Sequence, residues 1–113
     1  MSTDETKEAE APKKRVVTLK RPATLGEGAA ALTVSEIDLS GLDNLTGADA
    51  LFCQREAEAK KGEPTFYGVA DVGYRLEVAA KASGLPVQLF AKLHIVDFER
   101  VDNVVKLFLS DSA

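Results

Sequence analysis

The spacing of apolar side chains changes along this chain, and that change constrains the fold more than any other feature. Between residues 15 and 39 apolar and polar side chains alternate, as Val17 and Leu19 do with Thr18 and Lys20. A period of two is typical of a half-buried β-strand. From about residue 47 onward the apolar side chains recur every three or four residues, which is the period of an α-helix. The sequence therefore predicts strands first and helices afterwards.

Residues 15–39 are expected to form a β-hairpin. Gly26-Glu27-Gly28 supplies the backbone freedom that a chain reversal needs, and the alternation resumes at Leu32. The alternation slips by one residue before Ile37, so the apolar side chains change from one face of the strand to the other. We interpret this slip as a bulge at Ser35-Glu36.

Three or four helices are expected after the hairpin. The first begins after Thr46, which can form a capping pair with Asp49, and it ends at Gly62. Gly84 is placed to end the second helix, and Pro86 is placed to open the third. The predicted helices cover residues 47–61, 66–83, 86–92 and 95–110. Together with the hairpin they make an α+β fold that is mostly helical, an N-terminal β-hairpin followed by a bundle of three to four helices.

A chain of 113 residues has room for one domain of this kind. Residues 1–14 offer few apolar side chains to bury, so we expect a disordered tail there and a single domain over residues 15–113. The core should contain the apolar side chains on the buried faces of the hairpin and the helices. These are Val17, Leu19, Leu76, Phe98, Val101 and Val105.

Groups that could carry catalysis or hold a metal are scarce in the sequence. The chain has one histidine, His94, and one cysteine, Cys53, so the paired Cys and His ligands of a zinc site cannot be assembled. Cys53 is expected to behave as a small buried hydrophobe, and His94 as an exposed or helix-capping side chain. We therefore expect no catalytic residue, no metal site and no cofactor.

The charge and the hydropathy pattern limit the partners and the location. A net charge of −4 disfavours general affinity for nucleic acid, whose phosphates attract clustered Lys and Arg. One basic cluster is expected to be a solvated strand edge. It consists of Lys13, Lys14, Arg15, Lys20 and Arg21. The sequence has neither the roughly 18 to 20 consecutive apolar residues of a membrane span nor a signal-peptide pattern, so we expect a cytoplasmic protein.

Four groups of residues, in their order along the chain, carry a family resemblance. They are the segment from Asp38 to Gly47 with Asp49, the triplet Arg55-Glu56-Ala57, the segment from Ala79 to Pro86, and Asp97-Phe98 with Val101, Asn103-Val104-Val105 and Phe108-Leu109. Together with the opening strand, this order resembles the tail assembly chaperone family of long-tailed bacteriophages and prophages. His94-Ile95-Val96 departs from the family, whose last helix often begins with a proline.

The resemblance implies a non-enzymatic protein that is made in the cytoplasm of a bacterial host and is not part of the mature virion. It implies that the protein binds the tape measure protein, recruits subunits of the major tail tube protein and associates with itself, with no membrane partner. The alternative function is a small phage structural adaptor, or a nucleic-acid-binding regulator that uses the basic cluster from Lys13 to Arg21.

Four apolar residues are the candidates for partner binding. Leu51 and Phe52 belong to the apolar stripe of the first predicted helix. The other members of that stripe are Ala48 and Ala59. Phe108 and Leu109 stand near the end of the last helix, which frays unless something covers it. We expect the tape measure protein or a second copy of the chain to cover Phe108 and Leu109.

Overall fold

The computed structural model describes residues 15–62 and 70–110 of the chain. The predicted disordered tail lies outside the described residues, as do the first residues of the predicted helix 66–83. The described part contains strands β1 and β2, then helices α2 to α5, with two short 3-10 helices named η2 and η3. The predicted fold class, a mostly helical α+β arrangement with an N-terminal hairpin, is confirmed.

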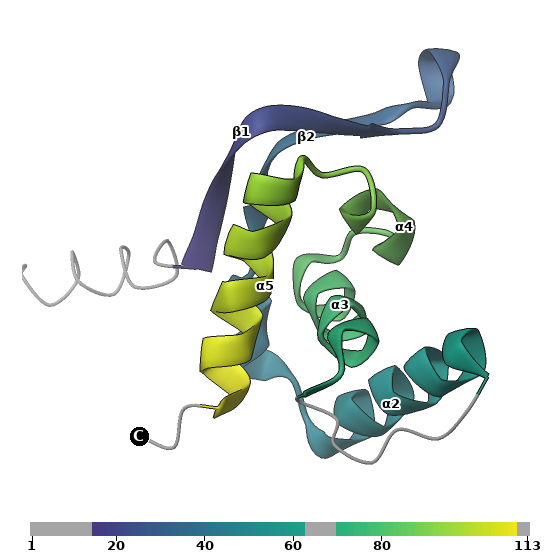
Figure 1. Cartoon of the computed structure of the whole chain (residues 1–113), viewed down its shortest axis with the longest axis vertical. Helices are drawn as coiled ribbons and strands as arrows, with labels where there is room; N and C mark the ends of the chain where they lie inside the picture. The colour runs from purple at the N-terminus through teal and green to yellow at the C-terminus, as the bar shows by residue number, and fades with distance from the viewer. Residues whose placement is uncertain (1–14, 63–69, 111–113) are drawn as a thin grey trace, which may run out of the picture.

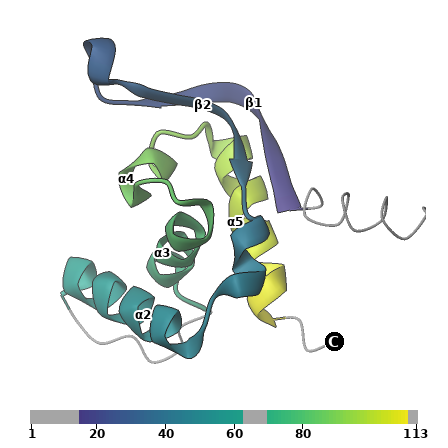
Figure 2. The same cartoon turned by 180° about the vertical axis from the view of Figure 1, so that it is seen from behind.

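The hairpin extends across one side of the helices (Figure 1). β1, Val16–Leu25, pairs antiparallel with β2, Leu32–Asp38, and the turn between them contains η2, Gly28–Ala30. α4 and α5 contact β1, whereas α2 packs on α3 at the side away from the hairpin arm (Figures 1 and 2).

The pairing of the two strands is interrupted once, by extra residues in β1. Between the pairs Thr18–Glu36 and Ala23–Val34, four residues of β1 lie opposite one residue of β2. The predicted bulge at Ser35-Glu36 was therefore assigned to the wrong strand. A bulge bends its own strand and increases the local twist, and the pairing resumes beyond it in a new register, with Ala23 opposite Val34.

Two helices have the predicted bounds. α2, Gly47–Lys61, begins at the predicted capping pair, in which Thr46 and Asp49 each accept the other's main-chain N–H. It ends at Gly62, which adopts the left-handed conformation with φ 85°. α5, Ile95–Ser110, follows His94, whose Nδ1 accepts the N–H of Val96 at 3.3 Å. Of the two roles predicted for His94, exposed or helix-capping, the structure shows the capping one.

The other two helices are shorter than predicted. α3, Val72–Ser83, starts six residues after the predicted start because the Asp71 carboxylate caps it, accepting the N–H of Tyr74 at 2.9 Å. It ends at Gly84, as predicted. α4, Val87–Phe90, is a single turn after Pro86. Within the described ranges, no helix combines the length and the apolar composition that crossing a bilayer requires.

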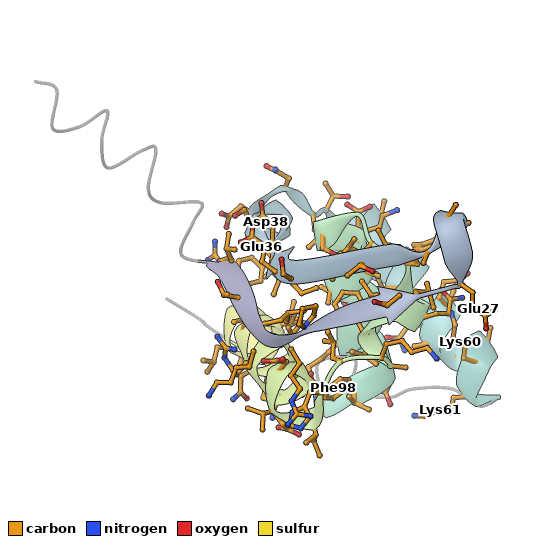
Figure 3. All side chains as sticks on the ribbon, turned by 90° about the horizontal axis from the view of Figure 1, so that it is seen from above. Glu27, Glu36, Asp38, Lys60, Lys61 and Phe98 are labelled. Atoms are coloured by element: carbon orange, nitrogen blue, oxygen red, sulfur yellow. The ribbon has the colours of Figure 1, made fainter. Side chains whose placement is uncertain are left out.

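The core lies between the hairpin, η3 (Ser40–Asn44), α3, α4 and α5. Of the predicted core residues, four are buried. They are Val17, Leu19, Val101 and Val105. Leu76 and Phe98 pack against the core but are only partly buried, whereas Val78 on α3 and Val101 on α5 are buried; Figure 3 labels Phe98.

Candidate functional site

α2 turns its predicted apolar stripe away from the core. The residues of α2 that are buried are Cys53 and Ala57, whereas Leu51 is 61% exposed and Phe52 is 42% exposed. Small side chains make the buried contact, because they let α2 approach α3 closely. We call the opposite surface the outer face of α2. It consists of Ala48, Leu51, Phe52, Arg55 and Ala59, all of them exposed.

Ion pairs between α2 and α3 hold this outer face in position. Lys60 Nζ lies 2.7 Å from Glu77 Oε2, and Lys61 Nζ lies 2.9 Å from Asp71 Oδ1. Both lysines lie in the last turn of α2, and both are labelled in Figure 3. Positive charge there also interacts favourably with the carbonyl end of the helix. These ion pairs therefore attach α2, the helix that carries the outer face, to α3.

The outer face carries positive charge at its centre and at one edge. Lys81 Nζ lies 4.5 Å from the centroid of the Phe52 ring and 3.7 Å from Asp49 Oδ1. Arg55 is exposed, and the described part of the chain gives it no ion pair. The face therefore combines apolar side chains with an available guanidinium.

Phe108 and Leu109 lie elsewhere, in a hollow of about 240 Å³ between η3, α2, α3 and α5. Its other apolar lining residues are Leu42, Leu45, Ala50, Cys53, Tyr74 and Val78. The Arg15 guanidinium covers Phe108 at 4.8 Å from the ring centroid, and Asp43 holds that guanidinium at 2.8 Å. The chain itself thus partly covers the end of α5.

The structure does not join the four candidate residues into one surface. Leu51 and Phe52 are on the outer face of α2, and neither lines the hollow that contains Phe108 and Leu109. The exposed apolar side chain at the end of α5 is Leu107, which is 67% exposed. Sequence reasoning missed Leu107 because it lies between the stripe and the polar face of the predicted helix.

Sequence reasoning also missed a buried carboxylate that ties α5 to the bulge of β1. Asp97 is fully buried, and its two oxygens accept the main-chain N–H groups of Lys20 and Arg21 at 3.0 to 3.1 Å. Arg100 donates to Asp97 at 3.1 Å and to the C=O of Thr18 at 2.7 Å. The hydrogen bond from Lys20 is the main cause that lowers the pKa of Asp97.

A second buried polar contact joins α3 to α5. Arg75 Nε donates to Asp102 Oδ1 at 2.7 Å, and Arg75 Nη2 donates to Asp102 Oδ2 at 3.0 Å. Both residues are buried, and the hydrogen bond to Asp102 raises the pKa of the Arg75 guanidinium. Such a two-point contact fixes the relative position of the helices, because both groups have a planar geometry.

Cys53 is fully buried, as predicted. Burial, followed by the charge of Glu77, raises the pKa of the Cys53 thiol to about 11, so little of it is thiolate at neutral pH. Among the residues that the structure describes, no three His, Cys, Asp or Glu side chains are grouped as metal ligands.

The structure describes three of the five residues of the predicted basic cluster. Lys13 and Lys14 lie outside the described residues, and Arg15 is engaged with Asp43. Lys20 and Arg21 are exposed at the bulge of β1, where their main-chain N–H groups bind Asp97. Within the part of the chain that the structure describes, these two neighbouring exposed cations are a small footprint for nucleic acid.

Comparisons with protein-family models, with curated proteins and with solved structures found no match for this chain. The resemblance to tail assembly chaperones therefore rests on the residue groups of the sequence.

Proposed function

We propose that this chain is a tail assembly chaperone of a long-tailed bacteriophage or prophage. It binds the tape measure protein and recruits subunits of the major tail tube protein, by protein contact and without catalysis. It acts in the cytoplasm of the bacterial host and is left out of the mature virion.

The outer face of α2 is the observation that carries this proposal. Soluble proteins bury most large apolar side chains, and a contiguous exposed apolar face marks a contact with another molecule. Leu51 and Phe52 are adjacent on α2 and are 61% and 42% exposed. Ala48 and Ala59 extend the face over about three helical turns, or roughly 16 Å along the axis. A face of that size fits one segment of an amphipathic helix.

The charge of the outer face indicates which helix it prefers. Arg55 lies among the apolar side chains, and covering it without a counter-charge would be costly. Lys81 adds positive charge beside Phe52. We therefore expect the segment of the tape measure protein that binds here to be helical, apolar on one face, and to carry a carboxylate that reaches Arg55.

The test is capture of the tape measure protein by the tagged chain after co-expression in bacteria. The variant Leu51→Glu with Phe52→Glu changes the outer face at exposed positions, so circular dichroism should stay close to that of the unchanged chain. We expect it to lose capture by about 10-fold or more, which is typical when central apolar contacts of an interface are removed. Leu107→Glu, at an equally exposed leucine of α5, is the matched control and should keep capture.

Capture that persists in the folded double variant would contradict the role of α2. Absence of capture by the unchanged chain would contradict the chaperone function itself. The positions of the neighbouring genes provide an independent check. This function predicts that a major tail protein gene precedes the gene for this chain and that a very long gene for a helical protein follows it.

A further inference from the structure

The main-chain hydrogen bonds of the hairpin show which groups point away from it. Leu39 donates its N–H to the C=O of Arg15 at 2.9 Å, so these residues form a hydrogen-bonded pair. In an antiparallel ladder such pairs alternate with pairs whose N–H and C=O point outward. Leu39 is a hydrogen-bonded position, so the alternate positions before it, Asp38 and Glu36, direct their N–H and C=O groups to the outer edge of β2. Thr18, the partner of Glu36, directs its own to the outer edge of β1.

α5 binds three main-chain groups of β1. Arg100 donates to the C=O of Thr18, and the Asp97 carboxylate accepts the N–H groups of Lys20 and Arg21. This edge is further protected by the bulge, by the exposed cations Lys20 and Arg21, and by Pro22. Another strand would have to displace all of these contacts to pair with β1.

Among the residues that the structure describes, β2 has none of these protections. Its seven residues include no lysine and no proline, and the extra residues of the bulge are all in β1. The sheet of the described chain contains β1 and β2 alone, so no further strand covers this edge. Thr33, Ser35, Glu36 and Asp38 are exposed. An unpaired edge of this kind is a template for an added strand.

Two of the four exposed side chains of β2 are acidic. Glu36 and Asp38 lie on the exposed side of β2, Ile37 between them is fully buried, and Glu27 lies near the hairpin tip (Figure 3). The N–H of Ser40 holds the pKa of Asp38 below its usual value, so this carboxylate is ionised at neutral pH. A strand beside β2 places every second side chain next to these carboxylates.

We propose that the outer edge of β2 binds an extended segment of another protein that carries Lys or Arg at alternate positions. Main-chain hydrogen bonds with Glu36 and Asp38 hold the segment, and the two carboxylates select a basic one. A second copy of this chain is the poorer occupant, because β2 paired with itself brings acidic edges together. This site goes beyond the proposed function, since it uses another element and another partner chemistry than the outer face of α2.

The probe is a synthetic eight-residue peptide in which lysine alternates with threonine. Its matched control carries N-methyl groups along the main chain, which removes the hydrogen-bond donors and keeps the charge. Fluorescence anisotropy with the full chain should show the unmodified peptide binding more tightly, by about 10-fold or more, because several main-chain hydrogen bonds are lost in the control. The amide resonances of Glu36 and Asp38 should shift. Equal binding of the two peptides would overturn the proposal.

Two variants of one residue separate the main-chain contact from the charge. Glu36→Pro removes the outward N–H while leaving the ladder to β1 intact, and Glu36→Gln removes the charge alone. We expect both variants to bind the peptide more weakly than the unchanged chain, and Glu36→Pro to bind it about 5-fold more weakly than Glu36→Gln. Equal affinities of the two folded variants would overturn strand addition. If Glu36→Pro does not fold, the affinities of the two peptides for the unchanged chain test the proposal. A dimer in sedimentation that Glu36→Pro dissociates would make a second copy the occupant and overturn the choice of a basic segment.

Discussion

Replacing Arg75 by methionine should destabilise the fold strongly, because it leaves a buried carboxylate without its cation. Arg75 on α3 and Asp102 on α5 meet at 2.7 Å, and their side chains are 9% and 8% exposed. Among the described residues, Asp102 has no other ion pair. Methionine keeps a long apolar side chain at the position, so the change removes mainly the charge and its donors.

The burial of the pair sets the size of the effect. Removing one partner of a buried ion pair costs about 3 to 5 kcal/mol, whereas exposed pairs contribute about 1 kcal/mol or less. Small domains have a total stability of about 5 to 15 kcal/mol, so the loss is a large share of it. For a domain of this size, each kcal/mol corresponds to roughly 4 to 8 °C in the unfolding midpoint. The midpoint should therefore fall by about 12 °C or more.

Urea unfolding followed by circular dichroism measures the free energy of unfolding. Three variants are compared with the unchanged chain: Arg75→Met, the same change together with Asp102→Leu, and Arg55→Met as the matched control. The paired change removes both charges, so it should recover most of the loss. The control replaces an exposed arginine that has no ion pair in the described part, and it should change stability by about 0.5 kcal/mol or less.

A loss of less than about 1 kcal/mol in Arg75→Met would contradict the predicted role of the buried pair, because the contact would then behave like an exposed pair. A paired variant as unstable as Arg75→Met would point to packing rather than to the orphaned carboxylate.

Three further results are expected. At pH 8, folded Cys53 should react with iodoacetamide about 100-fold more slowly than a thiol of the ordinary pKa 9.0, because its pKa of about 11 leaves that much less thiolate. Mass spectrometry measures the reaction rate. A rate equal to that of an ordinary thiol would contradict the burial of Cys53. Gly41→Ala should cost about 1 to 3 kcal/mol in thermal unfolding, since its Cβ would overlap the main-chain carbonyl of Ala82. Gly47→Ala, with no atom within 4 Å of an added Cβ, should leave the midpoint nearly unchanged. The pKa of Asp97 is lowered from 3.8, so its contribution to stability is present above that pH and disappears as the pH falls through the lower folded pKa. Asp97→Asn should make stability depend less steeply on pH in that acidic range, and an unchanged slope in acid titration would contradict this role.

The candidate site could be predicted from the sequence only in part. The periodicity of α2 placed Leu51 and Phe52 on one face, and the structure shows both of them exposed. The same reasoning put Phe108 and Leu109 at a fraying end, whereas the hollow and the Arg15 guanidinium partly cover them. Periodicity groups side chains on a face, but it does not say what lies opposite that face.

Features that depend on local contacts could be predicted from the sequence. The bounds of α2 follow from Thr46 and Asp49, which cap its first turn, and from Gly62, which ends its last turn. The hairpin likewise follows from alternation on both sides of a glycine-containing turn. Each of these signals depends on residues near one another in sequence, so a single sequence displays it.

The tertiary structure alone decided the strand that holds the bulge, the buried ion pair and the face of α2 that packs inward. Asp97 binds the bulge of β1 across 77 positions of sequence, and Arg75 meets Asp102 across 27. A buried carboxylate is stable only when its distant donors are in place, and nothing in the neighbouring residues marks it as buried. The face of α2 that packs inward is set in the same way, because the fit of α2 against α3 depends on the shapes of both helices.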